Sequence, residues 1–122
     1  MKMQFEAREL KTYAEPISTE TLKVGDTLFA VNFLDQKMLL PVMEPRVFIG
    51  RDLVPGDKDE FYFQDYDSYQ DGIRFETATK DSDAIFETGA EKHMFEYERA
   101  LDVLMNCALR RRKSASQNVS DA

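Results

Sequence analysis

The chain has 122 residues and a formal net charge of −7 at pH 7, and 43% of its residues are hydrophobic. This length and composition predict one domain that buries its own core, and they exclude a low-complexity chain. The lone cysteine excludes an internal disulfide and a cysteine-based zinc site. We find no signal-peptide core and no apolar run of membrane-spanning length, so we expect a cytoplasmic protein that does not use a membrane.

A short strand and a single helical turn are predicted near the N-terminus. Residues 3–7 alternate between apolar and polar side chains, which is typical of a strand. Residues 18–22 predict one helical turn after Pro16, with Ser18 or Thr19 as its N-cap.

The most apolar stretch, residues 27–53, is the predicted centre of the fold. Bulky side chains alternate over residues 27–34, which predicts a strand whose more apolar face packs on a core. A hairpin turn at 35–37 leads to a return strand at 38–43, which we expect to be broken or at an edge because Pro41 has no N–H. Pro45 then precedes a separate strand from Arg46.

Further strands are predicted at 61–63, 73–77 and 84–87, with a polar loop at 65–72. The sequence therefore predicts an α+β fold. Its sheet is small, mostly antiparallel and strongly curled or closed as a barrel, with five to seven short strands and one long C-terminal α-helix packed on it.

The last element is a predicted helix over residues 90–112. Its central apolar stripe consists of Met94, Tyr97, Leu101, Leu104, Met105 and Ala108, flanked by Ala100, Val103, Cys107 and Leu109. The apolar arc is about 240°, where a helix on one surface needs only ~100°. We therefore expect a homodimer through this helix, or a sheet that wraps around it. Residues 1–112 form the predicted domain, and 113–122 a disordered, basic-to-polar tail.

Charge is unevenly distributed along the chain. Residues 57–91 contain eleven acids and three bases, whereas Arg110–Lys113 form a basic run. An acidic body repels nucleic acid, so we expect no nucleic-acid partner and interpret the basic run as charge that favours the helix end. A basic protein surface or peptide is the expected partner.

Tyrosines and acids alternate within the acidic region, and we predict a binding surface there. Its residues are Tyr62, Asp65, Tyr66, Asp67, Tyr69 and Asp71. Aromatic anchors with neighbouring polar groups are typical of protein interaction sites. The alternative is that the tyrosines pack on the sheet and the acids are solvated.

No pattern indicates a catalytic, cofactor or metal site. The spacing from Asp65 to Glu76 resembles a calcium loop, but Gln70 occupies the position that requires glycine. His93 and Cys107 would lie ~21 Å apart on the predicted helix, too far for a nucleophile and its base. The sequence thus favours a non-enzymatic interaction module without a cofactor. The alternative is a protein, possibly an enzyme, that binds a small molecule or divalent cation in the mouth of the barrel.

Overall fold

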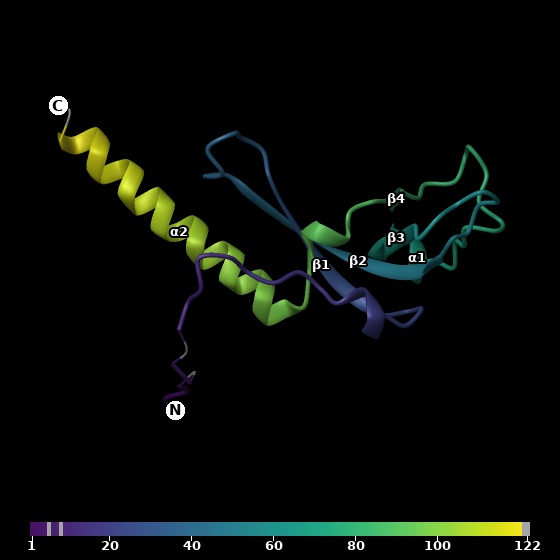
Figure 1. Ribbon diagram of the computed structural model, residues 1–122, viewed down its shortest axis with the longest axis horizontal. Coiled ribbons are helices and arrows are strands. Elements are labelled where there is room, and N and C mark those ends of the chain that lie inside the picture. Colours follow the sequence, from purple (N-terminus) through teal and green to yellow (C-terminus); the bar gives the residue numbers. More distant parts are fainter. Residues whose placement is uncertain (5, 8, 121–122) are drawn as a thin grey trace.

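The computed structural model describes residues 1–4, 6–7 and 9–120, with side chains described as far as Ser116. Five strands form one antiparallel sheet in the order β4-β3-β2-β1-β5, and a long helix packs on one end of it (Figure 1). The α+β fold is confirmed. Because β4 and β5 are the two edges of the described sheet, these strands do not close into a barrel.

The elements follow one another as η1 (Thr19–Thr21), β1 (Thr27–Phe33), β2 (Pro41–Arg51), β3 (Phe61–Asp65), α1 (Tyr66–Gln70), β4 (Phe86–Thr88), η2 (Glu91–His93), β5 (Met94–Phe95) and α2 (Tyr97–Ser120). The helical turn after Pro16 and the strand from Thr27 are confirmed. The strand predicted at 3–7 is not formed by its described residues, and Phe5 lies outside them.

Strand β2 is one continuous strand and is not broken at a proline. Strands β1 and β3 both pair with it only at Arg46 and Val47, because β3 ends opposite Arg46 at Asp65 and β1 begins opposite Val47 at Thr27. From Pro41 to Pro45 only β1 lies beside it. A proline is tolerated where one edge of a strand has no partner, so Pro41 and Pro45 limit the width of the sheet and leave β2 intact.

The predicted strand at 73–77 is wrong, because this segment turns back onto α1. Ile73 N–H donates to the Ser68 carbonyl at 3.0 Å, and the buried Gln64 side chain donates to the Ile73 carbonyl at 2.9 Å. The Phe75 ring packs 5.3 Å from both Tyr62 and Phe86, measured between ring centroids. The apolar residues that suggested a strand instead anchor a loop.

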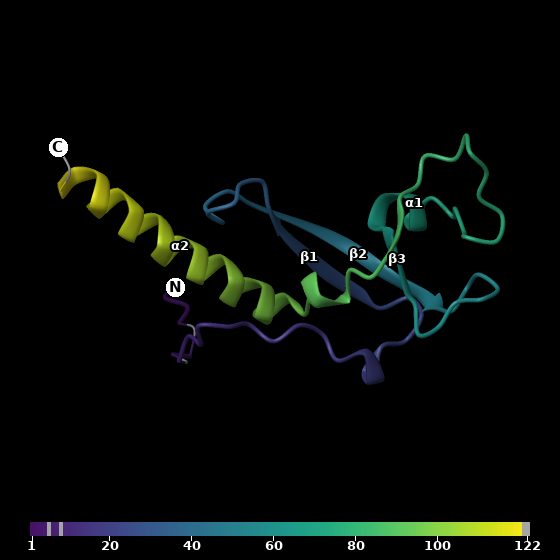
Figure 2. The same ribbon diagram turned by 45° about the horizontal axis from the view of Figure 1, so that its top comes forward.

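The sheet carries a hydrophobic core on each face. Leu28, Ala30, Phe48, Phe63 and Met94 form one core, and Ala14, Val31, Phe95 and Ala100 form the other. Alternation along β1 supplies both cores, since successive side chains of a strand point to opposite faces. The segment before η1 runs past α2 and β5 (Figure 2), where Ile17 N–H donates to the Met94 carbonyl at 2.8 Å.

Helix α2 begins at Tyr97, later than the predicted start at residue 90. Met94 and Phe95 are only 1% and 7% exposed and belong to opposite cores. Adjacent side chains reach opposite faces in a strand, so this pair forms β5 beside β1. The helix also continues past Arg112 to Ser120, so residues 113–120, which we assigned to a tail, have helical backbone. The division into one domain and a tail stays a prediction.

Helix α2 packs on the sheet through residues that we predicted to flank its apolar stripe, and not through the centre of the stripe. Ala100 and Cys107 are buried, whereas Met105 is 55% and Leu109 49% exposed. Beyond the end of β1, the helix holds the β1–β2 hairpin. The Arg110 guanidinium donates to the Met38 carbonyl from Nε at 3.1 Å and from Nη2 at 2.8 Å.

This assignment of faces predicts that Ala100→Leu lowers the free energy of unfolding by about 1–3 kcal/mol, because the position is fully buried and overpacks. Ala115→Leu, the same substitution at an exposed position of α2, should stay within about 0.5 kcal/mol of the wild type. Urea unfolding followed by circular dichroism measures both. A larger loss from Met105→Ala than from Ala100→Leu would show that the other face of the helix carries the packing.

Candidate functional site

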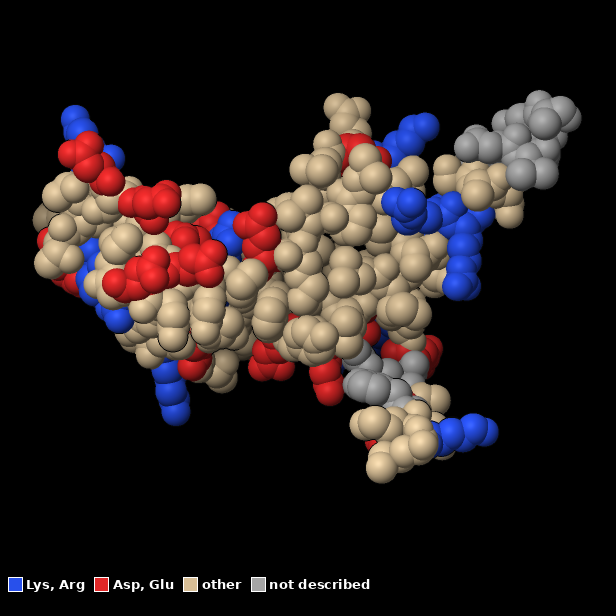
Figure 3. Space-filling view, turned by 180° about the vertical axis from the view of Figure 1, so that it is seen from behind, with Lys and Arg blue, Asp and Glu red and all other residues tan. Residues whose placement is uncertain are grey.

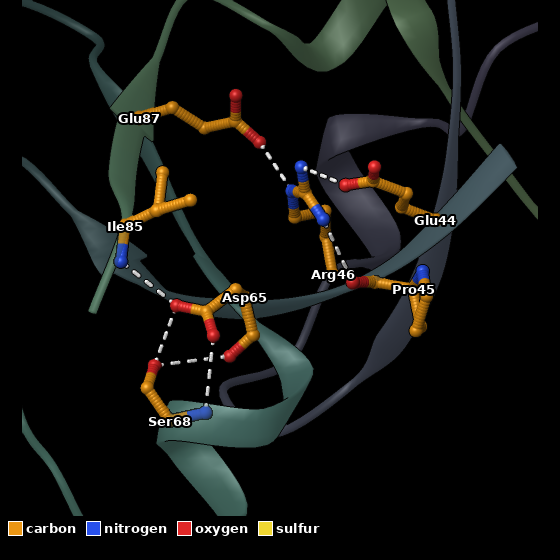
Figure 4. Close-up of polar contacts among 7 residues, drawn as sticks. All are labelled: Glu44, Pro45, Arg46, Asp65, Ser68, Ile85 and Glu87. Atoms are coloured by element: carbon orange, nitrogen blue, oxygen red, sulfur yellow. Dashed lines mark hydrogen bonds and ion pairs between the residues drawn. The ribbon is translucent and has the colours of Figure 1, made fainter. Parts of the chain in front are cut away.

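The region predicted as a polar loop contains the short helix α1, and Asp65 caps its N-terminus. The Asp65 carboxylate accepts hydrogen bonds from Ser68 N–H at 3.1 Å, from the Ser68 hydroxyl at 2.6 Å and from Ile85 N–H at 2.8 Å (Figure 4). The first two bonds close the first turn of α1. The third ties the loop before β4 to the same carboxylate, so the hydrogen bonds of Asp65 hold the fold together and do not serve a partner.

Burial of the Asp65 carboxyl raises its pKa, but the hydrogen bonds from Ile85 and Ser68 outweigh burial. The net result is a pKa below the ordinary value of 3.8. Hydrogen bonds to the charged form stabilise it, so Asp65 holds α1 in place as a carboxylate at neutral pH.

Tyr62 is turned inward and is not an exposed anchor. Its side chain is 7% exposed, and its ring lies against Phe75. Its hydroxyl donates to the carboxylate of Asp57. This hydrogen bond, with burial and the negative charge of Asp57, raises the pKa of Tyr62 to about 12. For Tyr62 the alternative of packing on the sheet is the observed one.

Tyr69 is half-buried and is covered by Arg74. The guanidinium carbon lies 3.9 Å from the centroid of the Tyr69 ring, within the distance of a cation–π contact. Nη1 of Arg74 also donates to the Tyr69 carbonyl at 2.8 Å. This face of the ring is therefore occupied from within the chain.

The remaining three predicted residues lie on the surface. Tyr66 is 38% exposed, and Asp67 on α1 and Asp71 at its C-cap are exposed as well. The structure thus leaves one tyrosine and two acids of the predicted surface accessible on a short helix that is capped and tied to β4.

An arginine that the sequence analysis did not single out links strands in the same region. Arg46 donates to Glu87 on β4 from Nε at 2.8 Å and to Glu44 on its own strand from Nη2 at 2.8 Å (Figure 4). Burial lowers the pKa of Arg46, but these two carboxylates more than compensate, so the pKa lies above its usual value. The spacing of Glu44 and Arg46, two residues apart on one face of a strand, was a signal for this pair.

Charge is segregated along the molecule. We call residues 57–87 the acidic end; they comprise β3, α1, β4 and the loops between them. Carboxylates crowd this end in Figure 3, while lysine and arginine crowd the opposite end, where Arg110–Lys113 lie on α2. Several acids here are engaged internally, as Asp59 pairs with Arg51 and Glu87 with Arg46.

The described chain holds neither a metal-ligand cluster nor a membrane-spanning helix. No three His, Cys, Asp or Glu side chains among these residues could hold a metal ion. None of the described helices has the length and apolar character needed to span a membrane. His93 lies in η2 and not on α2, so our premise for its distance from Cys107 was wrong.

Comparison with known proteins found no matching family model, no matching curated protein and no matching solved structure.

The cap at Asp65 has a testable pH dependence. Replacing Asp65 by Ala should cost about 0.5–2 kcal/mol of unfolding free energy at pH 7. Asp67→Ala, within the first turn of the same helix but not at the cap, should cost much less. The pKa of Asp65 is lowered in the folded state. Its charged form therefore stabilises the protein above its unfolded pKa, and that contribution is lost as pH falls through the folded pKa.

The stability difference between the wild type and Asp65→Asn should accordingly shrink as the pH falls from about 5 through the folded pKa of Asp65, because asparagine does not titrate in this range. Urea unfolding across this range measures it. A difference that stays constant with pH would show that the charge of Asp65 contributes nothing to the cap.

Proposed function

We propose that the protein is a non-enzymatic, cytoplasmic interaction module that recognises a basic protein surface or peptide through its acidic end, and that it acts as a homodimer. The observation that carries the first part is the exposure of Tyr66 together with two acids on a helix whose N-terminus is capped by Asp65. Tyr66 offers a ring with few rotatable bonds, and Asp67 and Asp71 add charge on the same short segment. Anchors of this kind dominate the free energy of many interfaces.

The capping network supports the proposal because it reduces the entropic cost of binding. Helix α1 is held by Asp65 and Ser68, and the buried Gln64 side chain donates to the Ser68 hydroxyl at 2.8 Å. A surface that is already ordered loses little conformational freedom when a partner docks. Charge segregation adds long-range attraction for a basic partner and orients its approach.

The binding proposal predicts the effect of a triple substitution, Tyr66→Ala with Asp67→Asn and Asp71→Asn. This variant should weaken binding of Lys- and Arg-rich 12-residue peptides at least about tenfold, because it removes the anchor and two charges together. Fluorescence anisotropy with labelled peptides at low and moderate salt measures the affinity.

The matched control is Tyr13→Ala with Glu9→Gln and Glu20→Gln. It removes one exposed tyrosine and the same number of negative charges away from the acidic end. If the control weakens peptide binding as much as the test variant does, net charge alone is responsible and the proposed surface is wrong.

The homodimer proposal rests on the outer face of α2, formed by Tyr97, Leu101, Met105, Ala108 and Leu109. Three of its large side chains are about half exposed: Tyr97 at 56%, Met105 at 55% and Leu109 at 49%. A contiguous exposed apolar face is typical of an interface. Val103, by contrast, packs against the core between α2 and the sheet, so it is not part of this face.

Charge along the helix favours an antiparallel pair. Glu96 and Glu98 lie at the start of α2, and Arg110–Lys113 lie further along it. In an antiparallel pair centred on Met105, the basic run of each copy lies beside the acidic start of the other, and Leu101 meets Leu109 of the second copy.

Met105→Glu with Leu109→Glu should therefore convert the protein from about twice the chain mass of 14.1 kDa to a monomer in size-exclusion chromatography with light scattering. Leu34→Glu is the control, since Leu34 is 77% exposed in the hairpin and is not one of the residues of this face. A wild-type mass of one chain at high concentration would remove the dimer.

A further inference from the structure

A cavity of about 360 Å³ lies where the N-terminal segment, the β1–β2 hairpin, η2 and α2 meet. Its lining residues are Thr12, Tyr13 and Ala14, then Phe33 and Met38, then Lys92, His93 and Phe95, and finally Val103, Asn106 and Arg110. It is separate from the acidic end, since no residue of 57–87 is among these. From its lining we infer that this hairpin–helix cavity binds a small amphipathic anion: an aromatic or aliphatic body that carries one acidic group.

The body of such a ligand would meet apolar walls. Phe95 is 7% exposed and belongs to the core between β1 and α2, and Val103 packs against that core from the helix. Phe33 and Met38 form the wall on the side of the hairpin. A volume of this size lies within the range of small-molecule pockets, which are mostly apolar with a few polar groups that orient the ligand.

The charge of the lining is opposite to that of the chain. Lys92, His93 and Arg110 line the cavity, and none of its described lining residues is acidic. The whole protein carries a net charge of −7. A local concentration of basic groups on an acidic protein favours an anion at this place over the rest of the surface.

Arg110 is already fixed in position. Its guanidinium binds the Met38 carbonyl through Nε and Nη2, which uses two of the five N–H groups of the side chain. The guanidinium carbon also lies 5.2 Å from the centroid of the Phe33 ring. A cation that is ordered before the ligand arrives loses little rotamer freedom on binding, so its attraction is retained in the affinity.

The hairpin wall is held in a conformation that most residues avoid. Met38 has a φ of 57°, and its carbonyl accepts from Arg110 and from the Cys107 thiol, whose sulfur is 3.5 Å away. Backbone strain of this kind persists only where the surroundings fix it, and it is concentrated at binding sites. On the opposite wall, Asn106 donates to the Lys11 carbonyl at 2.9 Å and ties the N-terminal segment to α2.

The test uses two fluorescent probes of similar shape. The first is the anion 8-anilinonaphthalene-1-sulfonate, and the second is neutral N-phenyl-1-naphthylamine. The full chain should bind the anion saturably at one site per chain. Lys92→Gln with Arg110→Gln should weaken the anion at least about fivefold and change the neutral probe less than about twofold, because only the charge interaction is removed.

Two further variants protect the test against a change in folding. Lys92→Gln alone leaves the bonds between Arg110 and Met38 intact, and it should weaken the anion about two- to threefold. Val103→Phe should weaken both probes, because the larger ring fills the cavity. Circular dichroism and melting temperature confirm that each variant is folded.

The control is Arg112→Gln with Lys113→Gln, which removes two positive charges from exposed positions of the same helix. It should leave the anion affinity unchanged within about twofold. Absence of saturable binding, an equal loss in the control, or an equal loss for the neutral probe in the Lys92 and Arg110 variant would overturn the inference. The triple variant at Tyr66, Asp67 and Asp71 should bind both probes normally, so this test is independent of the proposed function.

Discussion

Strand β1 is packed on both of its faces, and the rest of the structure depends on that constraint. Leu28, Ala30 and Val31 are each at most 3% exposed, although neighbouring residues of a strand point in opposite directions. Two apolar layers are therefore needed. The N-terminal segment with Ile17 and Leu22 packs on one core, and α2 covers the other. Elements from both ends of the chain thus meet at β1.

The proposed roles of the two ends of the molecule follow from this arrangement. The sheet extends from β1 toward β3 and β4, which carries the acidic loops and α1 away from the helix (Figure 1). On the other side, α2 continues past the sheet and reaches the hairpin turn through Arg110 and Arg111. Acidic and basic surfaces are kept apart because the strand order places β3 and β4 at the opposite edge of the sheet from β1 and β5, on which α2 packs.

Three of the six residues of the predicted binding surface are exposed, and their role in binding stays a prediction. Tyr66, Asp67 and Asp71 are on the surface, as expected for a polar segment. Tyr62 and Asp65 were predicted on the same grounds, but both are engaged within the fold. Tyr62 packs on Phe75 and donates to Asp57. Asp65 accepts hydrogen bonds from Ile85 and Ser68. The local sequence around a tyrosine or an acid looks the same whether its side chain is exposed or engaged inside the fold. Only the folded chain shows whether a donor or a ring lies within reach.

The sequence by itself determined the α+β class, the strand from Thr27 with its alternation, and the uneven charge, because periodicity and composition are local properties. Tertiary structure decided the rest. Met94 and Phe95 pair with β1 and so delay α2, Pro45 remains inside β2 because β3 ends opposite Arg46, and residues 73–77 form a loop on α1. In each instance the three-dimensional arrangement of neighbouring segments outweighed the local preference, and that arrangement is not encoded in any single window of sequence.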